Sequence, residues 1–209
     1  MSIFSDRKRE RISNLKKVAY ELDLNFTASD EYGLIALLRD FALFRRGHSK
    51  KIYNILHQKD EWHQSKLHLF DYKYVIGGGN NTRVLRQTVF FLQSKQLGLP
   101  QFLMKPEHFF HRIGNYLGWK QDIDFAEFPE FSKQYLLQGE DEEMVRYVMT
   151  NDMLNFFTVE KDWSLEGINY FLIFYAHNRL LSPKAIIDFY NKGMYLFDLL
   201  RQEPSDEFL

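Results

Sequence analysis

A glycine-rich segment between two strand-like runs is the sequence feature that most constrains how this chain can fold. In "SKLHLFDYKYVI" (65–76) large apolar and aromatic residues recur at every second position, as one face of a β-strand requires: Phe70, Tyr72, Tyr74 and Ile76. The run "TRVLRQTVFFLQS" (82–94) is rich in β-branched and aromatic residues, which also favour a strand. Only "GGGNN" (77–81) separates the two runs. They therefore predict an antiparallel hairpin closed by a short turn.

The same glycines could also form a phosphate-binding loop, but the residues that follow them favour the turn. A phosphate loop leads directly into a helix whose free N–H groups face the anion. The run after Thr82 has no helix-starting signal, and glycine and asparagine readily adopt the positive φ of a tight reversal. We therefore expect a hairpin tip and no nucleotide binding.

Helical and extended patterns elsewhere predict the remaining elements. Apolar residues at helical spacing indicate a helix over 6–22 with a basic outer face, whose apolar stripe should dock on the domain: Ile12, Leu15, Val18, Ala19 and Leu22. Ser29 suggests the N-cap of a second helix to about Leu43, and Ser182 with Pro183 suggests the start of a long C-terminal helix. Further helices are expected from Pro106 to Gly118 and over 140–157. Further strands are expected over 51–62, 101–105 and 131–139, and residues 163–177 should form a hairpin of two strands that turns near Glu166-Gly167.

This order of elements predicts the α+β class: an antiparallel sheet, made of a meander plus a C-terminal hairpin, packed against several helices. No Ser/Gly/Pro-rich linker divides the chain, so we expect a single domain over 1–209, with an N-terminal helical part at about 6–44 and a sheet and helix body at about 45–203. The stretch "LFRRGHSKKIYNIL" loosely resembles "LLQGEDEEMVRYVM", which suggests a two-unit pseudo-repeat.

Composition excludes several classes of protein. The chain has no cysteine, which excludes disulfides, thiolate zinc sites, iron–sulfur clusters and cysteine nucleophiles. Its 27 Lys and Arg are balanced by 28 Asp and Glu, so a surface devoted to nucleic acid is not expected. No run approaches the roughly 18 consecutive apolar residues of a membrane-spanning helix, and no early apolar run suggests a signal peptide. We therefore predict a cytoplasmic location.

Several stretches carry a resemblance to a protein family: "LFDYKY", "QTVFF", "LPQFLMKPEHF", "FSKQYLLQGEDEEMVR" and "WSLEG". With these the chain, from about 45 to 180, resembles a group of conserved bacterial proteins of unassigned function. The resemblance implies no catalytic residue or cofactor. Some members of that group carry a membrane-spanning segment ahead of this domain, and this sequence shows none.

Two sets of residues are candidates for binding. Glu107, His108 and His111 fall on one predicted helix, but the spacing E-H-x-x-H is not that of zinc proteases, so no metal is expected there.

Asp71 lies in an otherwise apolar strand opposite a run with two arginines. It could act as a general acid or base, or form a cross-strand ion pair, and the ion pair is favoured. The binding candidates of this second set are Asp71, Tyr72, Tyr74, Arg83 and Arg86.

Two basic segments, "DRKRERISNLKK" and "RRGHSKK", stand out against the neutral total charge. They could contact an acidic partner, nucleic acid or an anionic membrane surface, or they could serve solubility alone.

The function that these observations favour is a non-catalytic binding or protein-interaction module without a cofactor. The 20 Phe, 12 Tyr and 3 Trp favour an aromatic-packed core, and the other interpretation is that some of them form an added partner or ligand surface. Aromatic side chains that the core does not bury would suggest a protein partner or a homodimer. The alternative is a small-molecule or lipid-binding domain with an apolar cavity, and an enzyme is the third possibility.

Overall fold

An eight-stranded antiparallel sheet forms the centre of the molecule in the computed structural model, which describes residues 3–60, 65–108, 119 and 122–202. The spatial order is β1-β2-β3-β4-β8-β7-β5-β6, and every neighbouring pair is antiparallel. The strands are β1 (Asn25–Ser29), β2 (His48–Asp60), β3 (Ser65–Ile76), β4 (Arg83–Ser94), β5 (Leu99–Pro106), β6 (Tyr135–Gly139), β7 (Ser164–Asn169) and β8 (Phe171–Tyr175). The predicted α+β class with a single antiparallel sheet is confirmed.

The first four strands follow chain order, as the predicted meander does, and the C-terminal hairpin joins them through β4 and β8. In the second half β5 lies between β7 and β6. The two halves thus differ in strand order, and the two-unit pseudo-repeat stays a prediction.

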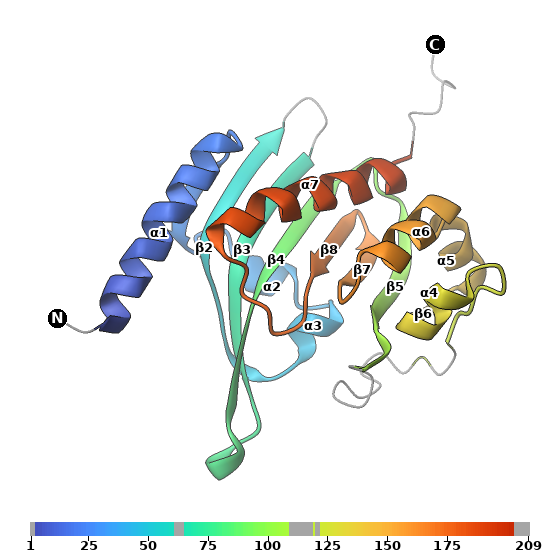
Figure 1. Cartoon of the computed structure of the whole chain (residues 1–209), viewed down its shortest axis with the longest axis horizontal. Coiled ribbons are helices and arrows are strands. Elements are labelled where there is room, and N and C mark those ends of the chain that lie inside the picture. Colours follow the sequence, from blue (N-terminus) through green and yellow to red (C-terminus); the bar gives the residue numbers. More distant parts are fainter. Residues whose placement is uncertain (1–2, 61–64, 109–118, 120–121, 203–209) are drawn as a thin grey trace.

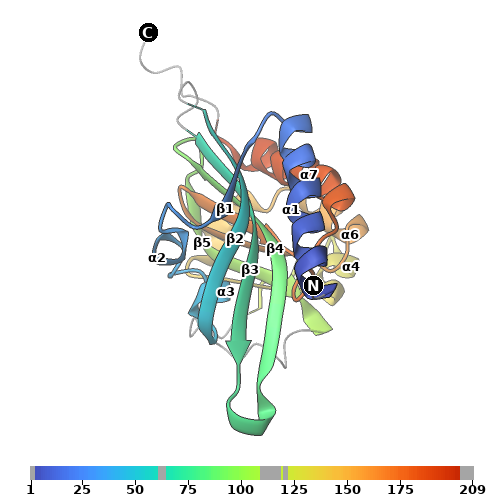
Figure 2. The same cartoon turned by 90° about the vertical axis from the view of Figure 1, so that its left-hand side faces the viewer.

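Helices cover both faces of the sheet (Figures 1 and 2). One face carries α1 (Ile3–Glu21), α4 (Pro129–Gln134), α5 (Glu142–Val148), α6 (Asn151–Val159) and α7 (Pro183–Leu200). The opposite face carries two short helices, α2 (Leu34–Leu37) and α3 (Ala42–Arg45). Among the described residues, no helix is long and apolar enough to cross a bilayer.

The alternation along β3 divides its side chains between two hydrophobic cores. Leu67 and Leu69 belong to the core beneath α1 and α7, whereas Phe70, Tyr72 and Tyr74 belong to the core beneath α2 and α3. Because both faces of the sheet are covered, β3 is buried on both sides from Leu67 to Tyr72 and at Tyr74 and Val75. This explains why both sides of the strand carry apolar residues, although Lys66, His68, Asp71 and Lys73 interrupt them.

The glycine-rich segment is a hairpin tip, as predicted. β3 and β4 pair without a break from Ser65 opposite Ser94 to Ile76 opposite Arg83, and a single 3-10 turn (Gly79–Asn81) closes the tip. Gly77 has φ of 78°, and a Cβ there would lie 2.4 Å from the carbonyl oxygen of Asn81. Glycine is therefore required at this position. The hairpin projects beyond the rest of the sheet (Figure 1).

The expected docking of the N-terminal helix is confirmed, because Leu15 and Val18 are buried in the core beneath α1 and α7. The C-terminal helix also begins where predicted: the hydroxyl of Ser182 accepts a hydrogen bond from the N–H of Ala185, and Pro183 occupies the first turn.

The predicted second helix from Ser29 to Leu43 is wrong. Ser29 ends β1, and the first residue of α2 is Leu34. The carboxylate of Asp30 accepts hydrogen bonds from the N–H groups of Tyr32 and Leu34, which forms a turn before the helix. Gly33, with φ of 68°, then sets the start of α2. The side chain of Asp30 thus holds a loop and does not start a helix.

Other boundaries also differ from the sequence prediction. The expected strand at 131–139 begins with helix α4 and becomes β6 only at Tyr135, and the expected helix at 140–157 is two helices, because Thr150 caps α6 anew. The C-terminal hairpin turns after Asn169, which has φ of 51°, and not near Glu166-Gly167. Pro106 ends β5 opposite Tyr135, and residues 109–118 of the helix predicted from it lie outside the described residues.

Candidate ligand-binding groove

A groove lies between α2 and the outer part of the sheet, on the face opposite α1. It encloses about 360 Å³ between the segment that carries α2 and strands β2, β3 and β4. Its lining, within the described residues, consists of aromatic, aliphatic, amide and cationic side chains without a carboxylate: Tyr32, Leu34, Leu37, His57, Gln58, Lys59, Lys66, His68 and Gln93.

The floor of the groove is a row of stacked rings that crosses three strands. The register places His57 of β2 opposite His68 of β3, and His68 opposite Phe91 of β4. The His57 and His68 ring centroids are 6.1 Å apart and those of His68 and Phe91 5.6 Å apart, and both pairs are stacked. Directly opposite residues point to the same face, so the pairing of the strands aligns these rings.

The wall of the groove comes from the segment that the Asp30 turn holds. Tyr32 places its ring edge against both histidines, 5.1 Å from His57 and 5.8 Å from His68. Its hydroxyl lies 3.2 Å from Nε2 of His57, which is also 3.1 Å from the hydroxyl of Thr27 on β1. Leu34 and Leu37 add aliphatic surface, and Leu37 remains 43% exposed.

The positive charge of the groove comes from lysines and not from its histidines. Burial lowers the pKa of His68 to about 4, helped by the nearby His57 and Lys66, and burial also lowers the pKa of His57. Both imidazoles are therefore neutral at pH 7. The next row of the sheet places Lys59 directly opposite Lys66, and both line the groove.

One polar atom in the groove floor has no internal role. Nδ1 of His68 is buried and has no hydrogen-bond partner within the described part of the chain. Buried polar atoms are almost always hydrogen-bonded in native structures. The groove thus offers an aromatic floor beside lysine side chains, above a buried polar atom that has no partner in the described part of the chain.

Two larger hollows have a different character. One, of about 590 Å³, is lined mainly by side chains of both charge signs, among them Glu107, His108, Lys133 and Asp162. There Nε2 of His108 lies 3.6 Å from a carboxylate oxygen of Asp162. The other, of about 500 Å³, lies where the C-terminal end of α7 meets α5. Neither has the apolar floor with converging charges that is typical of small-molecule sites.

The predicted site residues are not brought together. Glu107 and His108 are exposed in the first of these hollows, and His111 lies outside the described residues. Tyr72 and Tyr74 are buried in the core beneath α2 and α3, where their rings stack at 5.3 Å. Arg83 and Arg86 are exposed on the hairpin.

Asp71 forms an ion pair, but with a partner that the sequence did not indicate. The expected partners were Arg83 and Arg86, yet the residue opposite Asp71 on β4 is Thr88, and Lys73 lies opposite Arg86. The carboxylate accepts two hydrogen bonds from the Arg11 guanidinium, at 2.7 and 2.8 Å, and others from Asn54 and Thr88. With these donors in place, Asp71 holds α1 on the sheet.

The residues of the groove and one buried carboxylate were missed by sequence reasoning. Glu166 was expected in a turn, but it is buried in β7 and accepts hydrogen bonds from the N–H groups of Ala42 and Leu43 and from the hydroxyl of Tyr175. Burial raises the pKa of Glu166 to about 7, although these three hydrogen bonds favour the charged form. The hydrogen bonds from Ala42 and Leu43 to the Glu166 carboxylate connect α3 to the sheet. The one available signal for the groove was the pair of histidines eleven positions apart on two predicted strands.

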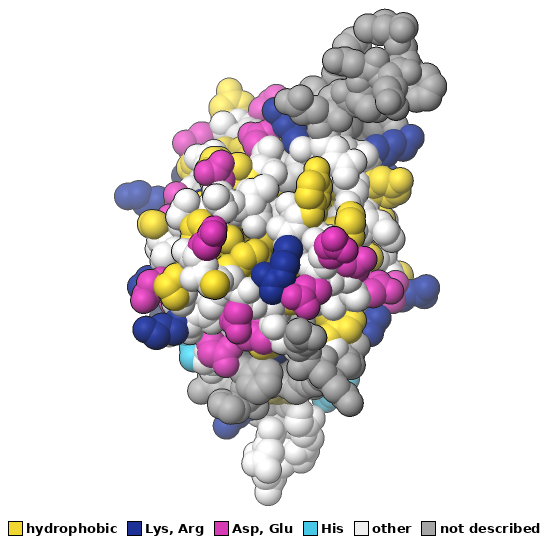
Figure 3. Space-filling view, turned by 90° about the vertical axis from the view of Figure 1, so that its right-hand side faces the viewer, with side chains coloured by type: hydrophobic (Ala, Val, Ile, Leu, Met, Phe, Trp, Pro, Cys, Tyr) yellow, Lys and Arg dark blue, Asp and Glu magenta, His cyan; other side chains and the backbone are white. Residues whose placement is uncertain are grey.

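A further exposed surface lies at the end of the molecule formed by α4, α5 and α6. Figure 3 shows hydrophobic side chains there among acidic ones. The exposed apolar residues of these helices and of α7 include Met144, Tyr147, Val159 and Tyr195, with Tyr147 76% and Val159 77% exposed. Single exposed apolar side chains are common, but two that are three-quarters exposed are candidates for a contact surface.

Comparison with known proteins gives a fold but no family. No family model and no curated protein matches the chain. Among solved structures, the chain is similar to the mycobacterial trehalose monomycolate transport factor A, TtfA, with a TM-score of 0.65 and 12% sequence identity, over 94% of this chain and 97% of that one. At this identity the similarity shows that the two chains share a fold over nearly their whole length.

Proposed function

We propose that this protein is a non-catalytic binding module whose groove beneath α2 holds a small amphiphilic anion. The observation that carries the proposal is the lining of the groove, where aromatic rings and leucines adjoin the exposed Lys66, and where the described lining residues include no carboxylate. Its volume of about 360 Å³ falls within the range of roughly 300–1,000 Å³ that is usual for ligand pockets.

Each part of the groove has a defined role in this proposal. The apolar body of the ligand packs against the His57 and His68 rings and against Leu37, because neutral imidazoles stacked on Phe91 present a flat, weakly polar surface. The anionic group lies near Lys66, where the adjacent Lys59 adds a second positive charge.

The groups in the groove favour binding over catalysis. General acid–base chemistry needs a group whose pKa lies near the working pH. The pKa of His68 is lowered to about 4, so its imidazole stays neutral and does not exchange a proton at pH 7. The solved neighbour is described as a transport factor for trehalose monomycolate, and that description is compatible with a binding role.

A titration with the fluorescent amphiphile anilinonaphthalene sulfonate tests the proposal. We expect saturable binding with one site in the folded protein, weakened by L37E, which places a charge against the apolar body, and by K66E, which repels the sulfonate. Both residues are at least partly exposed, so the fold should tolerate the changes. K95E, on an exposed residue elsewhere, is the matched control. No saturable binding, or equal binding by all variants, would overturn the proposal. Native mass spectrometry of freshly purified protein then reports any retained natural ligand.

A second candidate function is self-association, which the exposed apolar residues of α5 and α6 favour. Tyr147 and Val159 are the exposed anchors on which a dimer contact would depend. Sedimentation over a range of concentrations should show a dimer in the wild type and a monomer in the Y147E/V159E variant. A monomer mass at every wild-type concentration contradicts this candidate.

A further inference from the structure

Three cationic side chains form a row across the sheet at the base of the β3–β4 hairpin. The register places Lys51 of β2 opposite Lys73 of β3, and Lys73 opposite Arg86 of β4. Directly opposite residues point to the same face, which here is the face that carries α1. Lys51 and Arg86 are exposed and Lys73 is half-buried. We refer to these three residues as the cationic row.

The cationic row has no internal compensation. Like charges directly opposite one another in neighbouring strands are destabilising. None of the three side chains forms an ion pair with a residue in the described part of the chain. The neighbouring row contains the carboxylate of Asp71, but Arg11 already binds both of its oxygens. The fold therefore maintains three repelling charges whose natural complement is an external anion.

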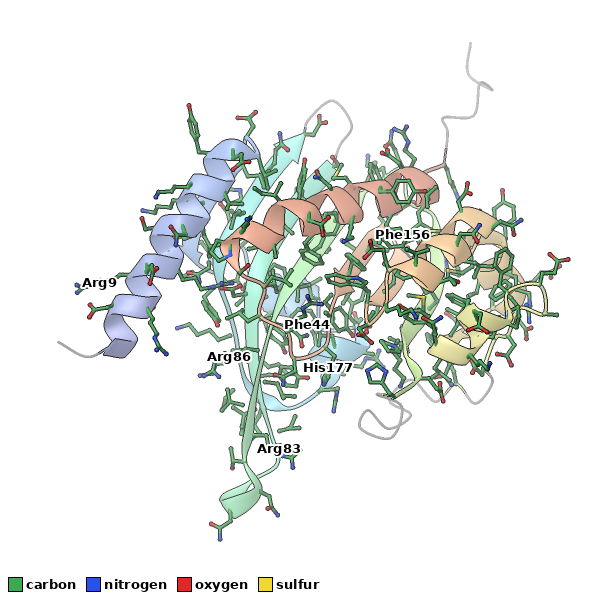
Figure 4. The ribbon with its side chains drawn as sticks, viewed as in Figure 1. Arg9, Phe44, Arg83, Arg86, Phe156 and His177 are labelled. Carbon is green, nitrogen blue, oxygen red and sulfur yellow. The ribbon has the colours of Figure 1, made fainter. Side chains whose placement is uncertain are left out.

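Both basic segments of the sequence converge on this place. Lys51 belongs to the segment "RRGHSKK", and Arg11, which binds Asp71 beside the row, belongs to "DRKRERISNLKK". Arg7 lies one helical turn before Arg11 and is exposed. The N-terminal end of α1 lies on the same side of the molecule as the hairpin (Figure 2), and Figure 4 shows Arg86 projecting from the hairpin toward the side of α1.

The hairpin beyond the row is uncharged at its tip and partly apolar. Between Lys73 and Arg86 the sequence contains no acidic residue, and from Gly77 to Thr82 it contains no charge at all. Val84 is 42% exposed and Ile76 is partly exposed. At about 3.3 Å per residue, Gly77 extends roughly 13 Å beyond Lys73. The segment from Gly77 to Thr82 can thus enter a lipid headgroup layer without burying a charge, while Arg83 at its base and the cationic row stay at the level of the phosphates.

We propose that the cationic row and the β3–β4 hairpin form a docking surface for an anionic lipid bilayer. Lys51, Lys73 and Arg86 bind lipid phosphates, and Val84, which points to the same face of the sheet as Arg86, contacts the headgroup layer. A bilayer fits better than nucleic acid because the hairpin presents no exposed aromatic ring on which a base could stack. This surface lies on the opposite face of the sheet from the groove, so the two proposals are independent.

Flotation with vesicles of stated composition tests this inference. The protein should bind vesicles made of equal parts of phosphatidylcholine and phosphatidylglycerol, and should not bind vesicles of phosphatidylcholine alone. Binding should weaken about fivefold for each cation removed, and most in the triple variant K51Q/K73Q/R86Q. It should also weaken with added salt, because exposed charges are screened.

The controls separate the surface from general charge and from folding. K95Q/K133Q/K161Q removes three exposed lysines elsewhere and should bind as the wild type does. The row variant should melt at the same or a higher temperature, since it loses only repulsion. No binding by the wild type, equal binding by both triple variants, or row-dependent binding to duplex DNA without vesicle binding would each overturn the proposal.

Discussion

Arg11 of α1 and Asp71 of β3, sixty residues apart in the chain, form a two-pronged ion pair: Nε and one terminal nitrogen of the guanidinium lie 2.8 and 2.7 Å from the two carboxylate oxygens. The other terminal nitrogen donates to the carbonyl of Leu181, just before α7. One arginine thus connects the N-terminal helix, the centre of the sheet and the segment that leads into the last helix. Two charges removed from water are held in place only because every donor is matched.

Removing the carboxylate should be costly. D71A leaves the partly buried Arg11 guanidinium without its counter-charge and Asn54 without its acceptor, so the free energy of unfolding should fall by about 3–5 kcal/mol. Urea denaturation measures this. In the exposed pair of Lys133 and Glu130, E130A should cost less than about 0.5 kcal/mol. Similar losses in both variants would contradict the role given to Asp71.

His68 and Glu166 should impose opposite pH dependences on stability. Burial lowers the pKa of His68 from 6.5 to about 4, so between these values the unfolded chain binds a proton that the folded protein does not. The contribution of the neutral His68 side chain to the free energy of unfolding is complete above pH 6.5 and is lost as the pH falls toward 4. Burial raises the pKa of Glu166 from 4.5 to about 7, so its contribution is present below pH 4.5 and is lost as the pH rises to 7.

In the shared window from pH 4.5 to 6.5 the two slopes, each roughly 1.4 kcal/mol per pH unit, should nearly cancel in the wild type. Urea midpoints measured across that window should therefore be flat. H68F should leave a stability that falls with rising pH, and E166Q one that rises with it. Flat profiles in both variants would show that neither shift is real.

The hairpin tip should depend on one of its glycines and tolerate change at the next. G77A places a Cβ against the carbonyl oxygen of Asn81 at a φ of 78°, so it should destabilise the protein by about 1–2 kcal/mol or more. G78A meets no atom within 4 Å and should be close to neutral. Thermal denaturation compares the two. An equal effect of both substitutions would contradict the assigned turn geometry.

Reversing the central charge of the cationic row should stabilise the fold. K73E places a carboxylate between Lys51 and Arg86, so two repulsive cross-strand pairs become attractive. We expect a gain of about 0.5–1 kcal/mol at low ionic strength that disappears in high salt. Urea denaturation at two salt concentrations measures it. K95E, on an exposed residue that pairs with no cation in the described part of the sheet, provides a charge-matched comparison and should change stability little. A loss of stability in K73E would contradict the repulsion assigned to the cationic row.

Local patterns were sufficient for the elements whose neighbours in space are also neighbours in sequence. The β3–β4 hairpin, the docking stripe of α1 and the Ser182 cap of α7 follow from periodicity and turn chemistry, and the structure confirms all three. The failures occurred where a single side chain redirects the backbone. Asp30 binds N–H groups of its own loop and prevents the helix expected from Ser29, and Thr150 divides one expected helix into two.

An antiparallel sheet covered by helices follows from the amino-acid pattern alone, because alternation, helical spacing and glycine placement are local properties of the chain. Which charges meet depends on the folded arrangement. Register set Lys73 against Arg86 and His57 against His68, and helix docking gave Asp71 its partner Arg11. The same folding buried Glu166 beneath α3. A residue type shows that a charge or ring is present, but its chemistry depends on burial and on partners that come from distant segments of the chain.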